Sequence, residues 1–200
     1  KTGARLKSIS SAAGVSSVHV ARKNGIEQAM TDSDSLLDDG TINALVITTR
    51  HNSHAKWVRA GLEAGKHIFV EKPLTLTGGE LDSLVDWCEQ QPSLPFVMVG
   101  FNRRYSPLVR GLQQFLKNSS SAKAVVMTVN AGAIPADHWT QDRSIGGGRI
   151  IGECCHFIDL LRYLVGSSIA EVSAVALDAA CRDTVSIQLR FVDGSIGTIN

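Results

Sequence analysis

The sequence predicts a doubly wound α/β sheet of parallel strands, followed by an α+β domain with an open antiparallel sheet. Short apolar strands alternate with amphipathic helices in the first half of the 200 residues, which is the pattern of a parallel sheet covered on both faces. A polar loop at residues 117–121 ends that alternation. Longer strand-like segments follow it, and Asp193-Gly194 between two of them is a strong hairpin signal.

In the first half, strands are expected at residues 5–10, 28–30, 44–49, 67–70 and 96–99. Helices are expected between them, at residues 15–23, 35–38, 54–64 and 77–89. Gly65 stands just past the third helix, where glycine commonly ends a helix in a left-handed conformation. Thr77 and Glu80 have capping-box spacing, in which a side-chain oxygen and a carboxylate each satisfy a free amide.

In the second half, a helix is expected at residues 108–116 and strands at residues 125–129, 171–177 and 185–191. A further amphipathic helix carries Phe157, Leu160, Leu161 and Leu164 on one face. We place the domain boundary at the change of pattern, which gives a partial first domain over residues 1–100 and a partial second domain over residues 101–200.

The composition is that of an ordinary globular chain, with 44% hydrophobic and 20% charged residues. Since the net charge is only +1 and both signs are interspersed, neither nucleic acid nor a membrane is expected as a partner. No apolar run reaches the ~18 residues needed to cross a bilayer. No secretory leader opens the chain, so a cytoplasmic location is expected. The start at Lys1, directly before a strand, indicates a missing upstream segment.

The cysteines follow no zinc-binding spacing, so no metal site is expected. The thiols are expected to be reduced. Adjacent Cys154 and Cys155 invite a redox or metal interpretation, but neighbours on a helix diverge by about 100°. We therefore favour buried, inert thiols. The four cysteines are Cys88, Cys154, Cys155 and Cys181.

Chemistry is expected at the carboxyl ends of the parallel strands, where loops and helix N-termini converge. The first candidate is the polar loop that runs from Thr48 and Thr49 through Asn52 to His54, between a buried strand and a helix. Its hydroxyls and the helix amides could hold a ribose or a phosphate. The plainer alternative is a simple helix cap with solvated histidines.

The second candidate is Glu71-Lys72-Pro73, at the end of an apolar strand. Proline favours an extended conformation for the preceding lysine, so two opposite charges are fixed at the strand end. A lysine placed there can hydrogen-bond a substrate hydroxyl as its proton leaves. A surface ion pair is the plainer alternative.

The third candidate combines the turn Gly146-Gly147-Gly148 with His156 on the following helix. Glycines allow a backbone to approach a ligand closely. Glu153 and Asp159 each lie three residues from His156, within reach of its ring by helical spacing. A carboxylate can set the tautomer of a histidine that acts as a base or donor. A structural histidine beside an apolar stripe is the alternative.

Three segments together resemble one known family across essentially the whole chain. They are residues 64–74, residues 100–107, and the glycine turn with His156 and Asp159. On these segments the chain resembles the glucose–fructose oxidoreductase and inositol dehydrogenase (Gfo/Idh/MocA) family.

The resemblance implies a Rossmann-like first domain that binds NAD or NADP, and a second domain whose sheet supports the substrate pocket and commonly subunit contacts. It implies that Lys72 and His156 face the reacting carbon. Because the family aspartate is replaced by Gly152, either Glu153 substitutes for it as a catalytic partner or the acid–base partnership is weakened. The residues implied near the cofactor are Thr48, Thr49, Asn52, His54, Glu71 and Asn102. The residues implied near the substrate are Arg104, Tyr105 and Asp159.

The chain departs from the family pattern at three places. The family usually carries an aspartate four residues before the histidine, and here that position is Gly152, with Glu153 beside it. No carboxylate stands near Ser11, where one would bind a ribose 2′-hydroxyl, which leaves NAD and NADP both open. The glycine-rich turn for the pyrophosphate is absent, so the first β-α unit is expected to be missing.

These observations predict a nicotinamide-dependent oxidoreductase that acts on a secondary alcohol of a sugar, sugar nucleotide or cyclitol. A noncatalytic protein that keeps this fold and senses a nucleotide or sugar is the alternative. Redox elimination or glycoside cleavage through a transient ketone also lies within the family's range. A homo-oligomer formed through the sheet of the second domain is expected.

Overall fold

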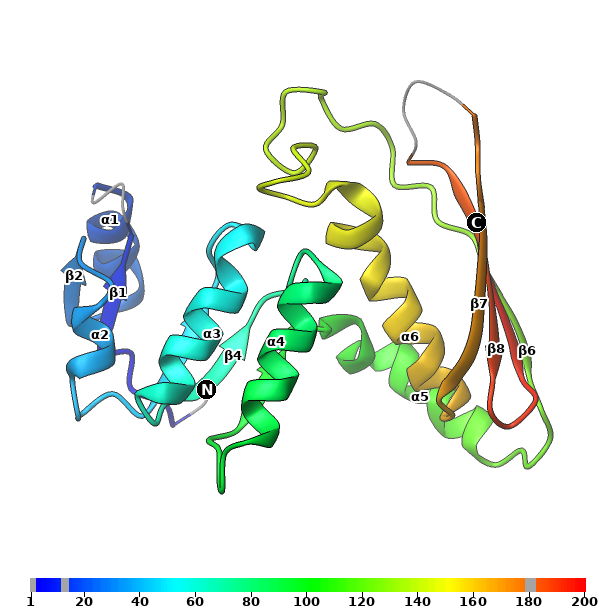
Figure 1. The fold of residues 1–200 in the computed structure, drawn as a ribbon, viewed down its shortest axis with the longest axis horizontal. Coiled ribbons are helices and arrows are strands. Elements are labelled where there is room, and N and C mark those ends of the chain that lie inside the picture. Colours follow the sequence, from blue (N-terminus) through cyan, green and yellow to red (C-terminus); the bar gives the residue numbers. More distant parts are fainter. Residues whose placement is uncertain (1–2, 12–14, 179–182) are drawn as a thin grey trace.

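The computed structural model describes residues 3–11, 15–178 and 183–200. Figure 1 shows three groups of elements following one another along the chain, with a small α/β unit first and the four-stranded sheet last. The helices are α1 (Val15–Asn24), α2 (Ser35–Asp38), α3 (His54–Glu63), α4 (Gly78–Glu89), α5 (Pro107–Lys117) and α6 (Cys155–Val165). Shorter 3-10 turns are η1 (His51–Ser53) and η2 (Asn102–Tyr105), and the π-helical segment η3 (Ile150–Cys154) runs directly into α6.

The strands of the first half are parallel, as the sequence predicts, but they form two separate sheets. Strands β1 (Ser8–Ser10) and β2 (Gln28–Met30) pair with each other. Strands β3 (Ala44–Ile47), β4 (His67–Val70) and β5 (Val97–Val99) form the second sheet in that order. Within the described ranges, no pairing joins the two sheets. The predicted domain boundary at residue 100 stays a prediction.

The core of the first half lies where α3 and α4 pack on the sheet β3-β4-β5. It contains Ile47, Val58, Leu62, Ile68, Val70 and Leu84. At Gly61 the helix α3 comes so close to the sheet that an added Cβ would lie 2.5 Å from Cδ1 of Ile68. Any Cβ at this position would push the packed Ile68 side chain aside, and this close approach places α3 beside the strands that carry the candidate site.

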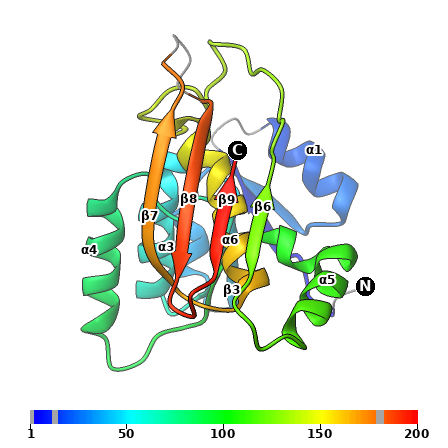
Figure 2. The same ribbon diagram turned by 90° about the vertical axis from the view of Figure 1, so that its right-hand side faces the viewer.

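The second half contains a four-stranded sheet in the order β6-β9-β8-β7. Its strands are β6 (Ala124–Met127), β7 (Ile169–Ala176), β8 (Val185–Phe191) and β9 (Ile196–Ile199). The pairs β7–β8 and β8–β9 are antiparallel, as expected, whereas β6 pairs with β9 in parallel, so the sheet is mixed. The hairpin predicted at Asp193-Gly194 is confirmed, with Gly194 at a φ of 85°. Figure 2 shows α6 behind this sheet.

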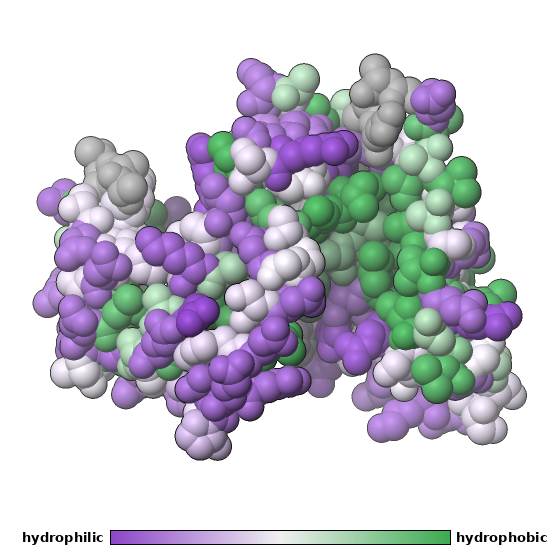
Figure 3. All heavy atoms as spheres, in the orientation of Figure 1, coloured by the Kyte–Doolittle hydropathy of each residue, from purple (hydrophilic) through white to green (hydrophobic). Residues whose placement is uncertain are grey.

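The second core is formed by α6 and the inner face of this sheet. Its buried members are Cys154, Phe157, Leu161, Val165, Ile187, Leu189, Phe191 and Ile199. Gly197 lets the helix approach β9, because a Cβ there would lie 2.9 Å from Cδ1 of Leu161. Figure 3 shows hydrophobic residues gathered in the hollow beside α6 and β7. Val172, on the β7 face that pairs with buried Leu189, is 63% exposed.

The cysteines within the described ranges are unpaired. Burial raises the pKa of the Cys155 thiol to about 11 and also raises the pKa of Cys154. Both thiols therefore stay protonated at neutral pH, in agreement with the prediction of inert side chains. Cys181 lies outside the described residues. Among residues 3–11, 15–178 and 183–200, no helix has both the length and the apolar content to cross a bilayer.

Candidate functional site

Three parallel strands end at one edge of the sheet β3-β4-β5, and each is followed by polar residues. Thr48 and Thr49 follow β3 directly, and Glu71 and Lys72 follow β4 directly. Asn102 comes after β5, separated from it by Gly100 and Phe101. The register pairs Ile47 with Val70 and Val70 with Val99, so the three ends are level. The sequence prediction that these residues share one edge is in accord with this register.

Lys72 connects this edge to the second half of the chain. Its Nζ donates a hydrogen bond to the carbonyl oxygen of Gly152 at 2.6 Å. Gly152 lies in η3, one turn before His156. The positive charge of Lys72 also contributes to lowering the pKa of His156. The ammonium of Lys72 and the imidazole of His156 therefore lie within electrostatic reach of each other.

His156 is buried, with 7% of its surface exposed. Its Nδ1 atom is buried and has no hydrogen-bond partner among the described residues. Burial lowers the pKa of His156 most, followed by the charges of Lys72 and Arg103, while Glu71 and Asp159 act in the opposite direction. The ring is therefore neutral at neutral pH. An orphaned polar atom in a buried position commonly marks a place where a ligand or water binds.

His54 is fully buried, and both of its ring nitrogens face backbone carbonyl oxygens. Nδ1 lies 2.7 Å from the oxygen of Pro73, and Nε2 lies 3.0 Å from the oxygen of Thr49. Both ring nitrogens thus lie against backbone oxygens, and the expectation that His54 lies near a cofactor stays a prediction. The His54 ring connects the loop after β3, which contains Thr49, to the loop after β4, which contains Lys72 and Pro73.

The other residues predicted near the cofactor are accessible. Thr48, Thr49, Asn52 and Asn102 are exposed. The hydroxyl of Ser53 donates to Oγ1 of Thr49 at 2.7 Å. The remaining residue, Glu71, is partly buried, and its carboxylate lies next to Gly100.

Gly100 leaves the space that the Glu71 carboxylate uses. A Cβ at this position would lie 3.1 Å from Oε2 of Glu71 and 3.2 Å from Cζ of Phe69. The negative charge of Glu71 raises the pKa of His156 in opposition to burial. The charges of Glu71 and Lys72 therefore both act on the pKa of His156, in opposite directions.

Arg104 and Asp159, both predicted to bind substrate, bind each other. The guanidinium donates to both carboxylate oxygens of Asp159, with Nε at 2.6 Å from Oδ2 and Nη2 on Oδ1. Asp159 is 8% exposed, so its carboxylate is nearly shielded from water and has Arg104 as its ion-pair partner. The pair raises the pKa of Arg104 and ties η2 to α6. Asp159 is therefore engaged in holding Arg104.

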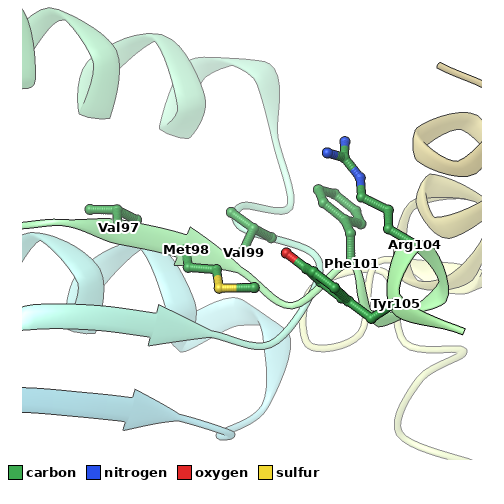
Figure 4. Close-up of a pocket in the computed structure, with 6 residues that line it drawn as sticks. All are labelled: Val97, Met98, Val99, Phe101, Arg104 and Tyr105. Carbon is green, nitrogen blue, oxygen red and sulfur yellow. The ribbon is translucent and has the colours of Figure 1, made fainter. Parts of the chain in front are cut away.

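Arg104 and Tyr105 line a small cavity of about 260 Å³ at the end of β5. Figure 4 shows the hydroxyl of Tyr105 pointing back toward the end of the strand, with Phe101 and Arg104 on the side of α6. The full lining is Val97, Met98, Val99, Phe101, Arg104 and Tyr105. The apolar wall with two polar groups at its mouth is suited to a small polar ligand.

Glu153 does not contact His156 in the described structure. Nε and Nη2 of Arg149 donate to its Oε2 at 3.1 Å and 2.9 Å. Arg149 also donates to the carbonyl of Gly132. The i,i+4 ion pair with Arg149 thus engages this carboxylate, and an acid–base partnership of Glu153 with His156 stays a prediction.

Three contacts of the site were not predicted from the sequence. His51 lies in the predicted polar loop, yet the sequence does not show that its ring reaches the glycine turn, where Nδ1 lies 2.8 Å from the oxygen of Gly146. Trp139 packs edge-on against His51, with ring centroids 4.8 Å apart. The Gly152 carbonyl that receives Lys72 is a backbone atom and leaves no signal in a sequence.

The donor set at this edge fits part of a dinucleotide. Exposed hydroxyls of Thr48 and Thr49 and the amide of Asn102 suit a ribose, and the buried Nδ1 of His156 is left without a hydrogen-bond partner among the described residues. A glycine-rich turn for a pyrophosphate does not occur in the sequence. The fit therefore concerns the sugar and the reacting end of a cofactor.

Comparisons with known proteins agree with this architecture. Residues 1–101 match the profile of an oxidoreductase family with an NAD-binding Rossmann fold, and residues 122–200 match the Gfo/Idh/MocA C-terminal domain. The chain is 30% identical over 186 residues to myo-inositol 2-dehydrogenase of Thermotoga maritima, which covers 89% of this chain and 55% of that protein. It is 33% identical over 162 residues to levoglucosan dehydrogenase of Pseudarthrobacter phenanthrenivorans, covering 78% of this chain and 40% of that protein.

Solved structures give the same result. The structure of levoglucosan dehydrogenase in complex with NADH and levoglucosan superimposes with a TM-score of 0.84 at 29% identity, covering 98% of this chain and 57% of that one. A probable dehydrogenase from Thermotoga maritima gives a TM-score of 0.85 at 26% identity, covering 98% and 61%. The matches thus span between 40% and 61% of the length of these relatives. With both of its halves matched, the chain belongs to the Gfo/Idh/MocA family of oxidoreductases.

Proposed function

We propose that the protein is a dehydrogenase that moves a hydride between NAD or NADP and a secondary alcohol of a sugar, sugar nucleotide or cyclitol. The observation that carries this proposal is the meeting of Lys72 with η3 and α6: Nζ is anchored on the Gly152 carbonyl, beside a buried histidine whose Nδ1 has no partner. Relatives named as inositol, levoglucosan and xylose dehydrogenases support the substrate class.

The cofactor, when bound, supplies the hydride acceptor or donor. Thr48, Thr49 and Asn102 are exposed at the strand ends and are the residues that we propose to hold its ribose by hydrogen bonds. Asn52 also contributes an exposed amide side chain. Its backbone N–H donates to the oxygen of Ile145 at 3.1 Å, so the polar loop and the glycine turn are held together.

Proton movement is proposed to involve Lys72 and His156. The Nζ of Lys72 can donate to the substrate oxygen and stabilise negative charge as the hydroxyl proton leaves. Because burial lowers the pKa of His156, the ring is neutral and one of its nitrogens can accept a proton. The negative charge of Glu71 opposes the effect of Lys72 on the ring, since it raises the pKa of His156. Arg104 and Tyr105 are proposed to contact the substrate at the mouth of the cavity, with Asp159 holding Arg104.

Replacing Lys72 by Met in the full-length protein tests this proposal. We expect kcat on a responsive sugar or cyclitol to fall by about a hundredfold or more, the usual size of lost acid–base catalysis. Lys56→Met is the matched control, because Lys56 is exposed and lies over the ring of Trp57 at 5.0 Å. Undiminished turnover of the Lys72 variant would remove this residue from the mechanism.

The cofactor and the noncatalytic alternative are separated by titration. NADH and NADPH are added to the full-length protein with nicotinamide fluorescence as the readout, and turnover is then measured on a panel of polyols and sugar nucleotides. Tight binding combined with no turnover on any member of the panel would favour a sensor. Turnover with one of the two cofactors would support the dehydrogenase and decide between NAD and NADP.

We also propose that two copies associate through the outer face of the sheet β6-β9-β8-β7. Val126, Val175 and Ile196 lie on this face and are 71%, 74% and 52% exposed. Exposed apolar side chains grouped on one sheet face are typical of contact surfaces. Val175→Lys should reduce the mass measured by light scattering toward that of one chain, and an unchanged mass would contradict this surface.

A further inference from the structure

His51 bridges the loop after β3 and the segment whose Gly152 carbonyl receives Lys72. Its Nδ1 lies 2.8 Å from the carbonyl oxygen of Gly146. A carbonyl only accepts hydrogen bonds, so Nδ1 must carry the proton and donate it. The neighbouring backbone N–H of Asn52 donates to the oxygen of Ile145 at 3.1 Å. Two adjacent residues of the polar loop are therefore hydrogen-bonded to Ile145 and Gly146, at the start of the glycine turn.

The ring of His51 also lies directly against Gly152. A Cβ added to Gly152 would lie 3.1 Å from Cε1 of His51 and 3.2 Å from the oxygen of Gly146. Any side chain at this position would therefore push against the ring and against the carbonyl that the ring binds. Gly152 is the residue whose own carbonyl receives Nζ of Lys72 at 2.6 Å.

The position of His51 is further fixed by aromatic contacts and by charge. The ring of Trp139 meets it edge-on at 4.8 Å, and the guanidinium of Arg50 lies 5.7 Å from the Trp139 ring. Burial lowers the pKa of His51 most; the hydrogen bond to Gly146 opposes this, and the charges of His54 and Lys72 lower it further. The contribution of Lys72 is an independent sign that the two side chains are close.

We propose that His51 is a positioning residue for Lys72: its ring holds the segment from Gly146 to Gly152 so that the Gly152 carbonyl faces Nζ. This inference rests on the proposed function, because it concerns the lysine of that same site. His51 acts through Gly152 and need not touch the substrate. The absence of a side chain at residue 152 is then a requirement of the His51 ring.

The test measures Lys72 directly, by competitive acetylation of the full-length protein followed by peptide mass spectrometry. Removing the ring in His51→Ala should raise the acetylation rate of Lys72 about fivefold, the order expected when one ordinary hydrogen bond is lost. His51→Asn keeps an N–H donor at nearly the same place and should stay within about twofold of the wild-type rate. Exposed Lys56 serves as the internal reference.

His19→Ala is the matched control, since this histidine is exposed on α1 and lies outside both the polar loop and the glycine turn. It should leave the acetylation of Lys72 unchanged. In turnover assays, His51→Ala should lower kcat by about tenfold or more while KM changes little, because misplacement of a catalytic group affects the reacting state most.

The outcomes separate the inference from the proposed function. Acetylation is read without turnover, so a wild-type protein that oxidises no polyol would contradict the proposed function and leave the acetylation result to decide on His51. If His51→Ala fails to fold, Gly152→Ala provides the second test, because its Cβ should displace the Gly152 carbonyl and also accelerate Lys72 acetylation. Wild-type acetylation of Lys72 in either folded variant would overturn the inference.

Discussion

Replacing His156 by Leu should stabilise the protein in the absence of ligands. His156 is 7% exposed, and its Nδ1 is buried without a partner in the part of the chain that the structure describes. Leaving a buried donor or acceptor unsatisfied costs about 1–3 kcal/mol. Leucine removes that cost, is a good helix former in α6, and joins the apolar stripe that already contains Phe157 and Leu160.

The net gain is smaller than the full cost of the unsatisfied atom. A change of shape in a packed site usually costs less than about 1.5 kcal/mol. We therefore expect the free energy of unfolding to rise by about 1 kcal/mol, which for a protein of this size raises Tm by about 2–4 °C. Urea denaturation followed by circular dichroism, with an unchanged m value, measures this difference.

His54→Leu is the matched control and should behave in the opposite way. Its ring nitrogens lie 2.7 Å and 3.0 Å from the carbonyl oxygens of Pro73 and Thr49. The ring can donate its one N–H to only one of these oxygens, so its loss leaves one buried carbonyl without a donor and should lower the free energy of unfolding by about 1–3 kcal/mol. A His156→Leu variant less stable than the wild type, or a His54→Leu variant equal to it, would refute the assignment of His156 as the unsatisfied histidine of the site.

Two further predictions concern pH and packing. Because burial lowers the pKa of His156 below its ordinary value of 6.5, the unfolded state takes up the proton first, and stability should fall as the pH drops below 6.5. Urea titrations at several pH values should show a shallower fall in His156→Leu; an identical slope would contradict the shift. Gly61→Ala should destabilise by about 1–3 kcal/mol, since its Cβ would lie 2.5 Å from Ile68 Cδ1. Gly79→Ala in α4, with no atom within 4 Å of the new Cβ, should stabilise by about 0.5–1 kcal/mol, and melting curves in which both variants shifted equally would contradict this packing.

The parts of the fold that local chemistry decides could be predicted from the sequence. The capping box at Thr77 and Glu80 is confirmed, with Thr77 Oγ1 accepting from the Glu80 N–H at 3.1 Å. The hairpin at Asp193-Gly194 is confirmed for the same reason, since a turn depends on residues next to each other. Strand direction is a different matter: apolar alternation is the same in either direction, so the parallel pairing of β6 with β9 was not predictable.

The site was predictable in its location and less so in its contacts. The carboxyl-edge rule selected Lys72 and its neighbours because each follows a strand. Helical spacing could not choose the partner of Glu153, since Arg149 and His156 both lie within one turn of it, and the structure shows the pair with Arg149. The burial of His54 depends on two loops far apart in the sequence, and the lysine contact with the Gly152 carbonyl involves a backbone atom.

The most direct test of the central claim, that Lys72 and His156 share one site, is a nuclear magnetic resonance titration of the His156 ring in the wild type and in Lys72→Met. The positive charge of Lys72 contributes to lowering the pKa of His156, so removing that charge should raise the pKa toward 6.5. An unchanged pKa of His156 in the Lys72→Met variant would show that the two side chains do not share a site, and would contradict the account.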